Sequence, residues 1–308
     1  MKFSFVLPAY KGRYLHDSIS SILNQDFIDF ELIVVDDCSP DPIREIVANF
    51  NDKRLSYYRN EQNIGGKDLV AQWNHCLEYA KGDYVILATD DDLYEPNFLS
   101  TFVPFIAKHP DVELFRSRVL NVNSDNRILW IDRCYKEFLT PLEFRYHKMH
   151  GMLGGIPNYI FRKDALVKQG GFVSLPLAWG SDDLTAIAMA GKGVVTSQQH
   201  LVRFRWSDIN ISSDRKNTGL DKLRARLLQG QWLAEHPIEN DAQGVWKDFY
   251  ESQVIDYLSV YTKITLIEAM NAMTWRDWLK SIRLLHRYDR LTFRDRLSIV
   301  LRSLQNRI

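Results

Sequence analysis

Three consecutive aspartates, Asp90, Asp91 and Asp92, follow a short apolar run in the first third of the chain. Like charges at this spacing repel one another and raise one another's pKa unless a cation lies nearby. A divalent cation would relieve the repulsion, and hard oxygen ligands suit Mg²⁺ or Mn²⁺, which typically take one or two carboxylates together with substrate phosphates. A solvated turn whose acids begin a helix is the alternative. The triplet indicates a metal site if other polar groups converge on it.

Two further polar clusters also follow apolar runs: the turn Pro8-Ala9-Tyr10, and the pair Asp36-Asp37. Strand-like runs alternate here with helical patterns of about a dozen residues, which indicates βαβ units and a parallel sheet. Right-handed crossovers bring the carboxyl ends of such strands to one edge, where ligands of open α/β sheets bind. We therefore expect the three clusters to converge at that edge. The strand-like runs lie at residues 3–9, 30–35, 54–58 and 83–88.

The second half of the chain is less regular. Residues 147–157 contain three glycines and are expected to form a mobile loop. A helix is expected from Ser181, its predicted N-cap, through residue 190, with Asp182 and Asp183 in the first turn, where the helix dipole favours acids. A last strand is expected over residues 193–205.

Long helical patterns dominate after about residue 217, which predicts a catalytic domain at 1–215 and a helical region at 216–308. Residues 276–308 hold nine Arg or Lys against three Asp, while the whole chain is neutral. Basic amphipathic helices that contain tryptophan can lie on anionic membranes. A lid packed on the domain or a homodimer interface fits the same amphipathic pattern, so these alternatives stay open.

The composition excludes several classes of protein. Of the 308 residues, 45% are hydrophobic and 25% are charged, as in globular proteins. Thirty-nine basic and thirty-nine acidic side chains cancel, so the overall basic field of nucleic-acid-binding proteins is absent and no nucleic-acid partner is expected. Three scattered cysteines indicate neither disulfides nor a zinc site. Without a signal sequence or a long apolar segment, a cytoplasmic protein is expected, free or peripheral on the cytoplasmic face of the inner membrane.

The N-terminal two thirds resembles a family 2 glycosyltransferase of the GT-A fold, a Rossmann-like, mostly parallel sheet between helices. The motifs lie in order over residues 1–100: a first strand ending in Pro-x-Tyr, a second strand ending in Asp-Asp-x-Ser-x-Asp, an Asn-x-Gly turn, an Ala-x-Gly-x-Tyr strand entry and an acidic metal motif followed by proline. In this sequence they are Val6–Tyr10, Val35–Asp41, Asn63–Gly65, Ala80–Val85 and Asp90–Pro96.

The resemblance implies roles for the matching positions. The turn at Pro8, Ala9 and Tyr10 together with Asp37 would hold the nucleotide base and ribose, Asp90 would contact the ribose, and Asp91 and Asp92 would serve the metal. The family's acceptor-activating carboxylate begins a later helix, usually as Glu-Asp, and Asp182-Asp183 is the matching pair. Which aspartate is the base stays open.

Several other candidates each have a structural alternative. Lys67 could approach a phosphate or be a solvated lysine. Arg205 resembles an arginine that relatives carry after the last strand, or it forms a salt bridge. His200 could be a third metal ligand, but a packing histidine is favoured at its strand position. Trp179 could stack on a sugar ring or belong to the core.

Sugar transfer to an alcohol requires one positioned carboxylate base and stabilisation of the departing nucleotide diphosphate. The resemblance therefore implies metal-dependent transfer with inversion, from a nucleotide-diphospho-sugar to a hydroxyl acceptor. UDP is the default by family frequency, and a glycan or lipid-linked glycan in bacterial surface polysaccharide assembly (O-antigen, capsule or lipopolysaccharide) is the expected acceptor. A sugar-1-phosphate nucleotidyltransferase and a non-catalytic glycan-binding scaffold are the alternatives. A nucleotidyltransferase needs a Gly-x-Gly-x-Arg segment after its first strand, and this sequence does not contain one there.

Overall fold

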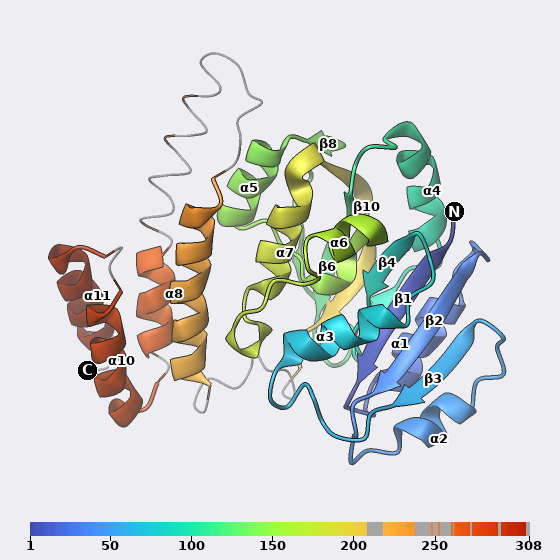
Figure 1. The fold of residues 1–308 in the computed structure, drawn as a ribbon, viewed down its shortest axis with the longest axis horizontal. Helices are drawn as coiled ribbons and strands as arrows, with labels where there is room; N and C mark the ends of the chain where they lie inside the picture. Colours follow the sequence, from blue (N-terminus) through green and yellow to red (C-terminus); the bar gives the residue numbers. More distant parts are fainter. Residues whose placement is uncertain are drawn as a thin grey trace.

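The computed structural model describes residues 1–207, 218–237, 262–271, 273–288 and 291–305, with isolated positions at 248, 252 and 260. A central mixed sheet lies between helices, and a helical extension leads away from it to the C-terminus, at the opposite end of the molecule from the sheet (Figure 1). The strands are β1 (Phe3–Ala9), β2 (Phe30–Asp36), β3 (Leu55–Arg59), β4 (Tyr84–Leu87), β5 (Leu93–Tyr94), β6 (Leu114–Val122), β7 (Ile128–Ile131), β8 (Phe138–Leu139), β9 (Tyr159–Arg162) and β10 (Val194–Arg205).

The described helices follow the strands in βα order through the first half of the chain. They are α1 (Leu15–Leu23), α2 (Ile43–Ala48), α3 (Leu69–Glu78), α4 (Phe98–Lys108), α5 (Pro141–Met149), α6 (Lys163–Lys168), α7 (Ser181–Met189), α8 (Gly219–Glu235), α10 (Trp275–His286) and α11 (Phe293–Gln305), with short 3₁₀ turns η1 (Ile156–Asn158), η2 (Pro176–Ala178) and η3 (Ala190–Lys192). Among these residues, no helix combines the length and hydropathy needed to cross a bilayer.

The strand order is β3-β2-β1-β4-β9-β6-β10-β5, with β7 and β8 paired to β6 and β10. The first four strands are parallel, as expected from their βαβ pattern. Strand β9 runs antiparallel to both of its neighbours, β4 and β6. The expected α/β class is confirmed, and the carboxyl ends of β1, β2 and β4 share one edge.

Strand β1 shows why the apolar runs are continuous rather than alternating. Phe3, Phe5 and Leu7 enter one apolar cluster together with residues of α1, α2 and α4. Val6 enters a second cluster, which includes residues of α3, α6 and α7. Successive side chains of a strand point to opposite faces, so a sheet covered on both faces has apolar residues at most positions. The buried exception, Ser4, donates a hydrogen bond to Glu31.

One local expectation was correct only in part, and another was wrong. The segment expected to be a loop at 147–157 begins inside α5, a helix that starts with a capping box in which Thr140 and Glu143 bond each other's backbone N–H groups. The N-cap of α7 is Gly180, not Ser181. Gly180 has φ 89°, a left-handed conformation that glycine adopts without strain, and a Cβ there would lie 2.9 Å from the Gln229 amide.

The C-terminal helices have their own apolar cluster, which includes Leu223, Leu266, Trp278, Leu285 and Ile299. Helix α8 contacts both η2 and α10, and so joins this cluster to the part of the chain that contains the sheet. The boundary predicted at residues 215 and 216 falls outside the described residues and stays a prediction.

Candidate active site

The turn after β1 is fixed by the first aspartate of the triplet. Oδ2 of Asp90 accepts hydrogen bonds from the backbone N–H groups of Tyr10, at 3.1 Å, and Lys11, at 2.8 Å. These residues are about eighty positions apart in sequence, and they meet because β1 and β4 are adjacent parallel strands. Burial raises the pKa of the Asp90 carboxyl, and the two N–H donors oppose that rise.

Asp37 holds the loop that precedes α3. Its Oδ1 accepts from the Asn60 side chain at 2.8 Å and from the Ile64 N–H at 2.9 Å, and its Oδ2 accepts from the Gly65 N–H at 2.7 Å. Only glycine fits at position 65 without displacement, because a Cβ there would lie 2.9 Å from Asp37 Oδ2. The expected Asn-x-Gly motif therefore packs against the expected Asp-Asp motif.

The neighbouring aspartate, Asp36, is fully buried, and its contacts stabilise the turn after β2. It accepts hydrogen bonds from the Tyr57 hydroxyl at 2.7 Å and from the Ser39 N–H at 2.8 Å, and it forms an ion pair with Arg59. A polar cleft of about 490 Å³ adjoins this turn, lined in part by Ser39, Arg44 and Arg59. The cleft supplies room and cationic groups beside the carboxyl end of β2.

The other two aspartates of the triplet differ in burial, since Asp91 is partly exposed and Asp92 is buried. Asp92 is 1% exposed, and its carboxylate accepts from the Arg205 N–H at 2.7 Å and from the Thr89 hydroxyl. Burial, followed by repulsion from Asp90, raises the pKa of Asp91 to about 6. Burial also raises the pKa of Asp90 and, well above its usual range, that of Asp92, so the charged form of all three carboxyls is disfavoured unless a cation lies nearby.

Arg205 ends β10 against the triplet, with 2% of its surface exposed. Its Nε donates to the backbone carbonyl of Asp91 at 2.8 Å, and its guanidinium lies 4.3 Å from the centre of the Tyr14 ring. These contacts give Arg205 a part in holding the triplet in place.

The donor set fits a divalent cation only together with a substrate. No group of three or more His, Cys, Asp or Glu side chains suited to a metal occurs in the described part of the chain, so His200 does not complete one with the triplet. Mg²⁺ and Mn²⁺ sites with one or two carboxylates take their remaining ligands from substrate phosphates and water. Asp91, with Asp92 behind it, fits that kind of site.

The second acidic pair lies at the start of α7. Asp183 forms an ion pair with Lys148 of α5 at 2.5 Å, and the side chains are 26% and 4% exposed respectively. Burial and then repulsion from Asp183 raise the pKa of Asp182 to about 7, while Lys148 opposes the rise. Burial would lower the pKa of Lys148, but Asp183, Tyr159 and Asp182 more than offset this, so it is raised. Aspartates and lysine thus form one electrostatic unit.

Trp179 lies just before this pair and faces α8. Lys222 Nζ is 4.5 Å from its ring centre and the Arg226 guanidinium is 5.4 Å away. Two cations therefore lie against the indole ring, one of which, Arg226, also lowers the pKa of Asp182. Lys67, by contrast, is exposed beside the Gly65-Gly66 turn.

Lys148 was missed from the sequence. It lies 35 positions before its partner, in the last turn of α5, where a loop was expected, and one lysine in a polar stretch gives no signal of its own. The Thr-Pro-Leu-Glu capping box at 140–143 could have revealed the helix. The pairing itself follows only from the packing of α5 against α7.

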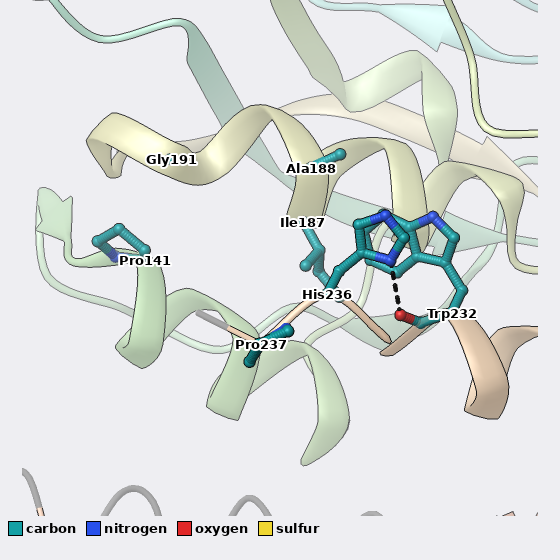
Figure 2. Close-up of a pocket in the computed structure, with 7 residues that line it drawn as sticks. All are labelled: Pro141, Ile187, Ala188, Gly191, Trp232, His236 and Pro237. Carbon is teal, nitrogen blue, oxygen red and sulfur yellow. Dashed lines mark hydrogen bonds between the residues drawn. The ribbon is translucent and has the colours of Figure 1, made fainter. Parts of the chain in front are cut away.

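A separate pocket of about 330 Å³ lies between α5, α7 and the end of α8 (Figure 2). His236 stacks on Trp232 at its wall, with 4.1 Å between ring centres, and its Nδ1 lies 2.9 Å from the Trp232 carbonyl oxygen. None of the seven residues lining it is an expected site residue. The other lining residues are Pro141, Ile187, Ala188, Gly191 and Pro237.

The family model described as Glycosyl transferase family 2 matches residues 4–166, more than half of the 308-residue chain. The chain belongs to this family. The match confirms the family expected from the N-terminal motifs. It includes Asp37 and the triplet, and it ends before Asp182 and Asp183.

Curated relatives cover different shares of the chain. Poly(ribitol-phosphate) beta-N-acetylglucosaminyltransferase TarS of Staphylococcus aureus is 34% identical over 126 residues, which are 39% of this chain and 22% of TarS. Putative glycosyltransferase EpsE of Bacillus subtilis is 38% identical over 113 residues, 35% of this chain and 39% of EpsE. The Escherichia coli glucosyltransferase WfgD, which is named for UDP-Glc and a diphosphoundecaprenol acceptor, is 28% identical over 148 residues, 47% of this chain and 54% of WfgD. The chain thus matches from about a fifth to about half of their lengths.

Solved structures confirm the GT-A fold. S. aureus TarS residues 1–349 in complex with UDP-GlcNAc superposes with a TM-score of 0.67 at 20% identity, covering 100% of this chain and 89% of that one. The mannosyltransferase PcManGT of Pyrobaculum calidifontis, in complex with GDP-Man and Mn²⁺, gives a TM-score of 0.54 at 17% identity, covering 99% and 86%. At these identities the likeness concerns the fold alone.

Proposed function

We propose that the chain transfers a sugar, with inversion and with a divalent metal, from a nucleotide-diphospho-sugar to a hydroxyl acceptor. The observation that carries the proposal is the convergence of the β1 turn and the acidic triplet at one edge of the sheet, through the hydrogen bonds of Asp90 to Tyr10 and Lys11. Ligands of open α/β sheets bind at this edge. Membership of Glycosyl transferase family 2 supports the same reaction class.

The donor nucleotide would lie against the β1 turn and the loop that Asp37 holds. Pro8, Ala9 and Tyr10 form this turn, in which Tyr10 is 40% exposed and available for stacking on a base. Asp90 would face the ribose, and exposed Lys67 would approach the diphosphate. UDP is the proposed nucleotide, in keeping with the UDP-GlcNAc complex of TarS.

Mn²⁺ or Mg²⁺ would be held by Asp91, with Asp92 supporting. Bound there, the cation would supply positive charge for the departing diphosphate. The chain's own contribution is to keep Asp92 fixed through Arg205 and Thr89, so that the neighbouring Asp91 stays in place when substrates enter. PcManGT, whose structure contains GDP-Man and Mn²⁺, supports this choice of metal.

Asp183 is the proposed base, and Asp182 its coupled neighbour. A base is most effective when a third group orients it, and Lys148 provides that orientation for Asp183. Asp183 would accept the proton of the acceptor hydroxyl as the oxygen attacks the sugar carbon, while the bond from that carbon to the diphosphate breaks. One base suffices for a single displacement, which inverts the configuration.

The proposed acceptor is a glycan or lipid-linked glycan of a bacterial surface polysaccharide, and the proposed location is the cytoplasm or the cytoplasmic face of the inner membrane. The names of two relatives from E. coli support this setting. WcaA is named for colanic acid biosynthesis, and WfgD for a diphosphoundecaprenol-linked acceptor.

Hydrolysis of a panel of nucleotide sugars, with Mn²⁺, with Mg²⁺ and with chelator, tests the proposal. One nucleotide sugar should be hydrolysed slowly in the presence of metal, and calorimetry should show metal-dependent binding of the matching nucleoside diphosphate. Metal-independent binding would reject the role of Asp91. No binding of UDP, GDP or CDP under any condition would favour a non-catalytic scaffold.

A further inference from the structure

Helices α10 and α11 expose a second set of large apolar side chains in addition to those that they bury. On α10, Trp275 is 54% exposed and Leu279 is 60% exposed. On α11, Phe293 is 76%, Leu297 is 48% and Leu301 is 50% exposed. Residues four apart lie on the same face of a helix, so the exposed residues form one stripe on each helix. We call these two stripes the outer faces.

The inner faces of the same helices are already satisfied. Trp278, Leu285 and Ile299 are buried in the C-terminal apolar cluster. The Trp278 indole N–H donates to the Ser303 hydroxyl at 2.9 Å and so ties α10 to α11. On the outer face of α10 the Trp275 ring lies edge-on against Trp278, with 5.6 Å between ring centres, yet 54% of Trp275 stays exposed. Apolar exposure of this extent commonly marks an interaction surface.

The exposed charges beside the outer faces are all positive. Six Arg or Lys side chains are exposed on or directly after the two helices: Arg276, Lys280, Arg283, Arg287, Arg294 and Arg302. Within the described part of 275–305, no acidic residue is exposed to that degree. Asp277 and Asp295 are both drawn in at the helix N-termini, where their N–H groups bond Thr274 and Thr292 and their carboxylates pair with Lys280 and Lys263.

We propose that the outer faces of α10 and α11 dock on an anionic lipid surface, with their apolar side chains in the boundary between headgroups and acyl chains. Aromatic and leucine side chains flanked by Arg and Lys suit this interface, because the apolar groups enter the acyl boundary while the cations stay at the phosphates. Each cation adds attraction to anionic headgroups. This docking does not depend on the proposed catalytic function.

A second copy of the chain fits the outer faces less well. A symmetric dimer brings the same patch of both copies together, so the exposed arginines of one copy would face those of the other. The described residues of these helices place no exposed acid between them, and Asp277 already pairs with Lys280. An anionic bilayer can bind the cations through its headgroups and the apolar stripes through its acyl chains. Charge complementarity therefore favours a membrane over a second copy of the chain.

Co-sedimentation of the full chain with vesicles tests the docking. Binding to phosphatidylcholine vesicles that contain phosphatidylglycerol should be strong and should fall as salt increases, and binding to pure phosphatidylcholine should be weak. The variant Leu279→Ser/Leu297→Ser should bind at least roughly tenfold more weakly. Arg276→Gln/Arg283→Gln/Arg294→Gln should lose most of the dependence on phosphatidylglycerol.

Matched controls keep the test specific to this surface. Ile28→Ser/Val167→Ser removes exposed apolar groups elsewhere, since these side chains are 80% and 54% exposed. Lys53→Gln/Lys81→Gln/Lys168→Gln removes the same number of charges from exposed lysines outside the C-terminal helices. Both controls should bind like the wild type. Equal binding of all variants, or no binding to anionic vesicles, overturns the proposal, as does a dimer in sedimentation velocity that Leu279→Ser/Leu297→Ser dissolves.

Discussion

Lys148 Nζ lies 2.5 Å from a carboxylate oxygen of Asp183, and the lysine side chain is 4% exposed. The pair joins the polar helix α5 to the first turn of helix α7. Few arrangements hold a lysine this far from water, because burial alone disfavours its charge. The neighbouring carboxylates offset that effect, and the lysine in turn fixes the direction of the carboxylate that we assign as the base.

Replacing Lys148 with methionine should lower kcat by about 10²-fold, because the base loses the group that orients it. Unfolding should become easier by about 1–3 kcal/mol, less than for a fully buried pair since Asp183 is 26% exposed. Lys148 also opposes the rise in the pKa of Asp182, so the acid limb of kcat/KM should move to higher pH. Initial rates across pH and urea denaturation measure these effects.

Lys148→Arg should restore part of kcat, since it keeps the charge but changes the geometry. Lys136→Met is the matched control, because Lys136 forms a similar ion pair with Glu143 while its own side chain is 70% exposed. Loss of stability in Lys148→Met with an unchanged kcat and pH profile would make Lys148 purely structural.

The pH dependence of the reaction should reflect the ionisation of Asp182. Its pKa is raised to about 7 by burial and by Asp183. Ionisation of Asp182 adds negative charge beside the base and favours proton transfer to it, so kcat/KM should rise with pH, with a midpoint near the same value. Asp182→Asn should remove this limb and keep measurable activity. Asp183→Asn should lower kcat by roughly 10²–10⁴-fold. The opposite pattern in the two variants would exchange the roles.

We expect different effects from substituting Asp91, the proposed metal ligand, and Asp92, which supports it. Asp91→Ala should reduce turnover at least about 10²-fold with little change in stability, because its carboxylate serves the bound donor and cation. Asp92→Ala should destabilise the fold by about 1–3 kcal/mol, since it leaves the buried Arg205 N–H without its acceptor. Thermal denaturation beside nucleotide titration tells these apart, and Asp125→Ala in the exposed β6–β7 turn is the control. Near-normal turnover of Asp91→Ala would show that the metal site lies elsewhere.

Gly65→Ala should weaken binding of the nucleoside diphosphate by roughly tenfold, because the added methyl group would lie 2.9 Å from Asp37 Oδ2 and displace the loop. Gly191→Ala serves as control, since a methyl group added there would meet no atom of another segment within 4 Å. Calorimetric titration with UDP measures both. Equal affinities would show that the loop held by Asp37 takes no part in binding.

The positions of the motifs that we assign to the donor could be predicted from the sequence because each motif is contiguous. An apolar run ending in Pro8-Ala9-Tyr10 or in Asp36-Asp37 shows both the strand and the polar group that it delivers. The acidic pair of α7 could also be predicted, but not the cap at Gly180, since the left-handed φ of 89° that favours glycine there is set by the tertiary fold. Lys148 could not be predicted, because its partner is set by tertiary packing. The antiparallel β9 likewise depends on pairing partners that no local pattern encodes.

The loop at 60–65 already directs the backbone N–H groups of Ile64 and Gly65 to Asp37. A variant designed to bind another nucleotide should therefore keep this loop unchanged. A substitution in the loop would also disturb its hydrogen bonds to Asp37. Tyr10 and Lys67 are both exposed, and we propose that they contact the nucleotide. A library of substitutions at these two positions should therefore change recognition without disturbing the scaffold.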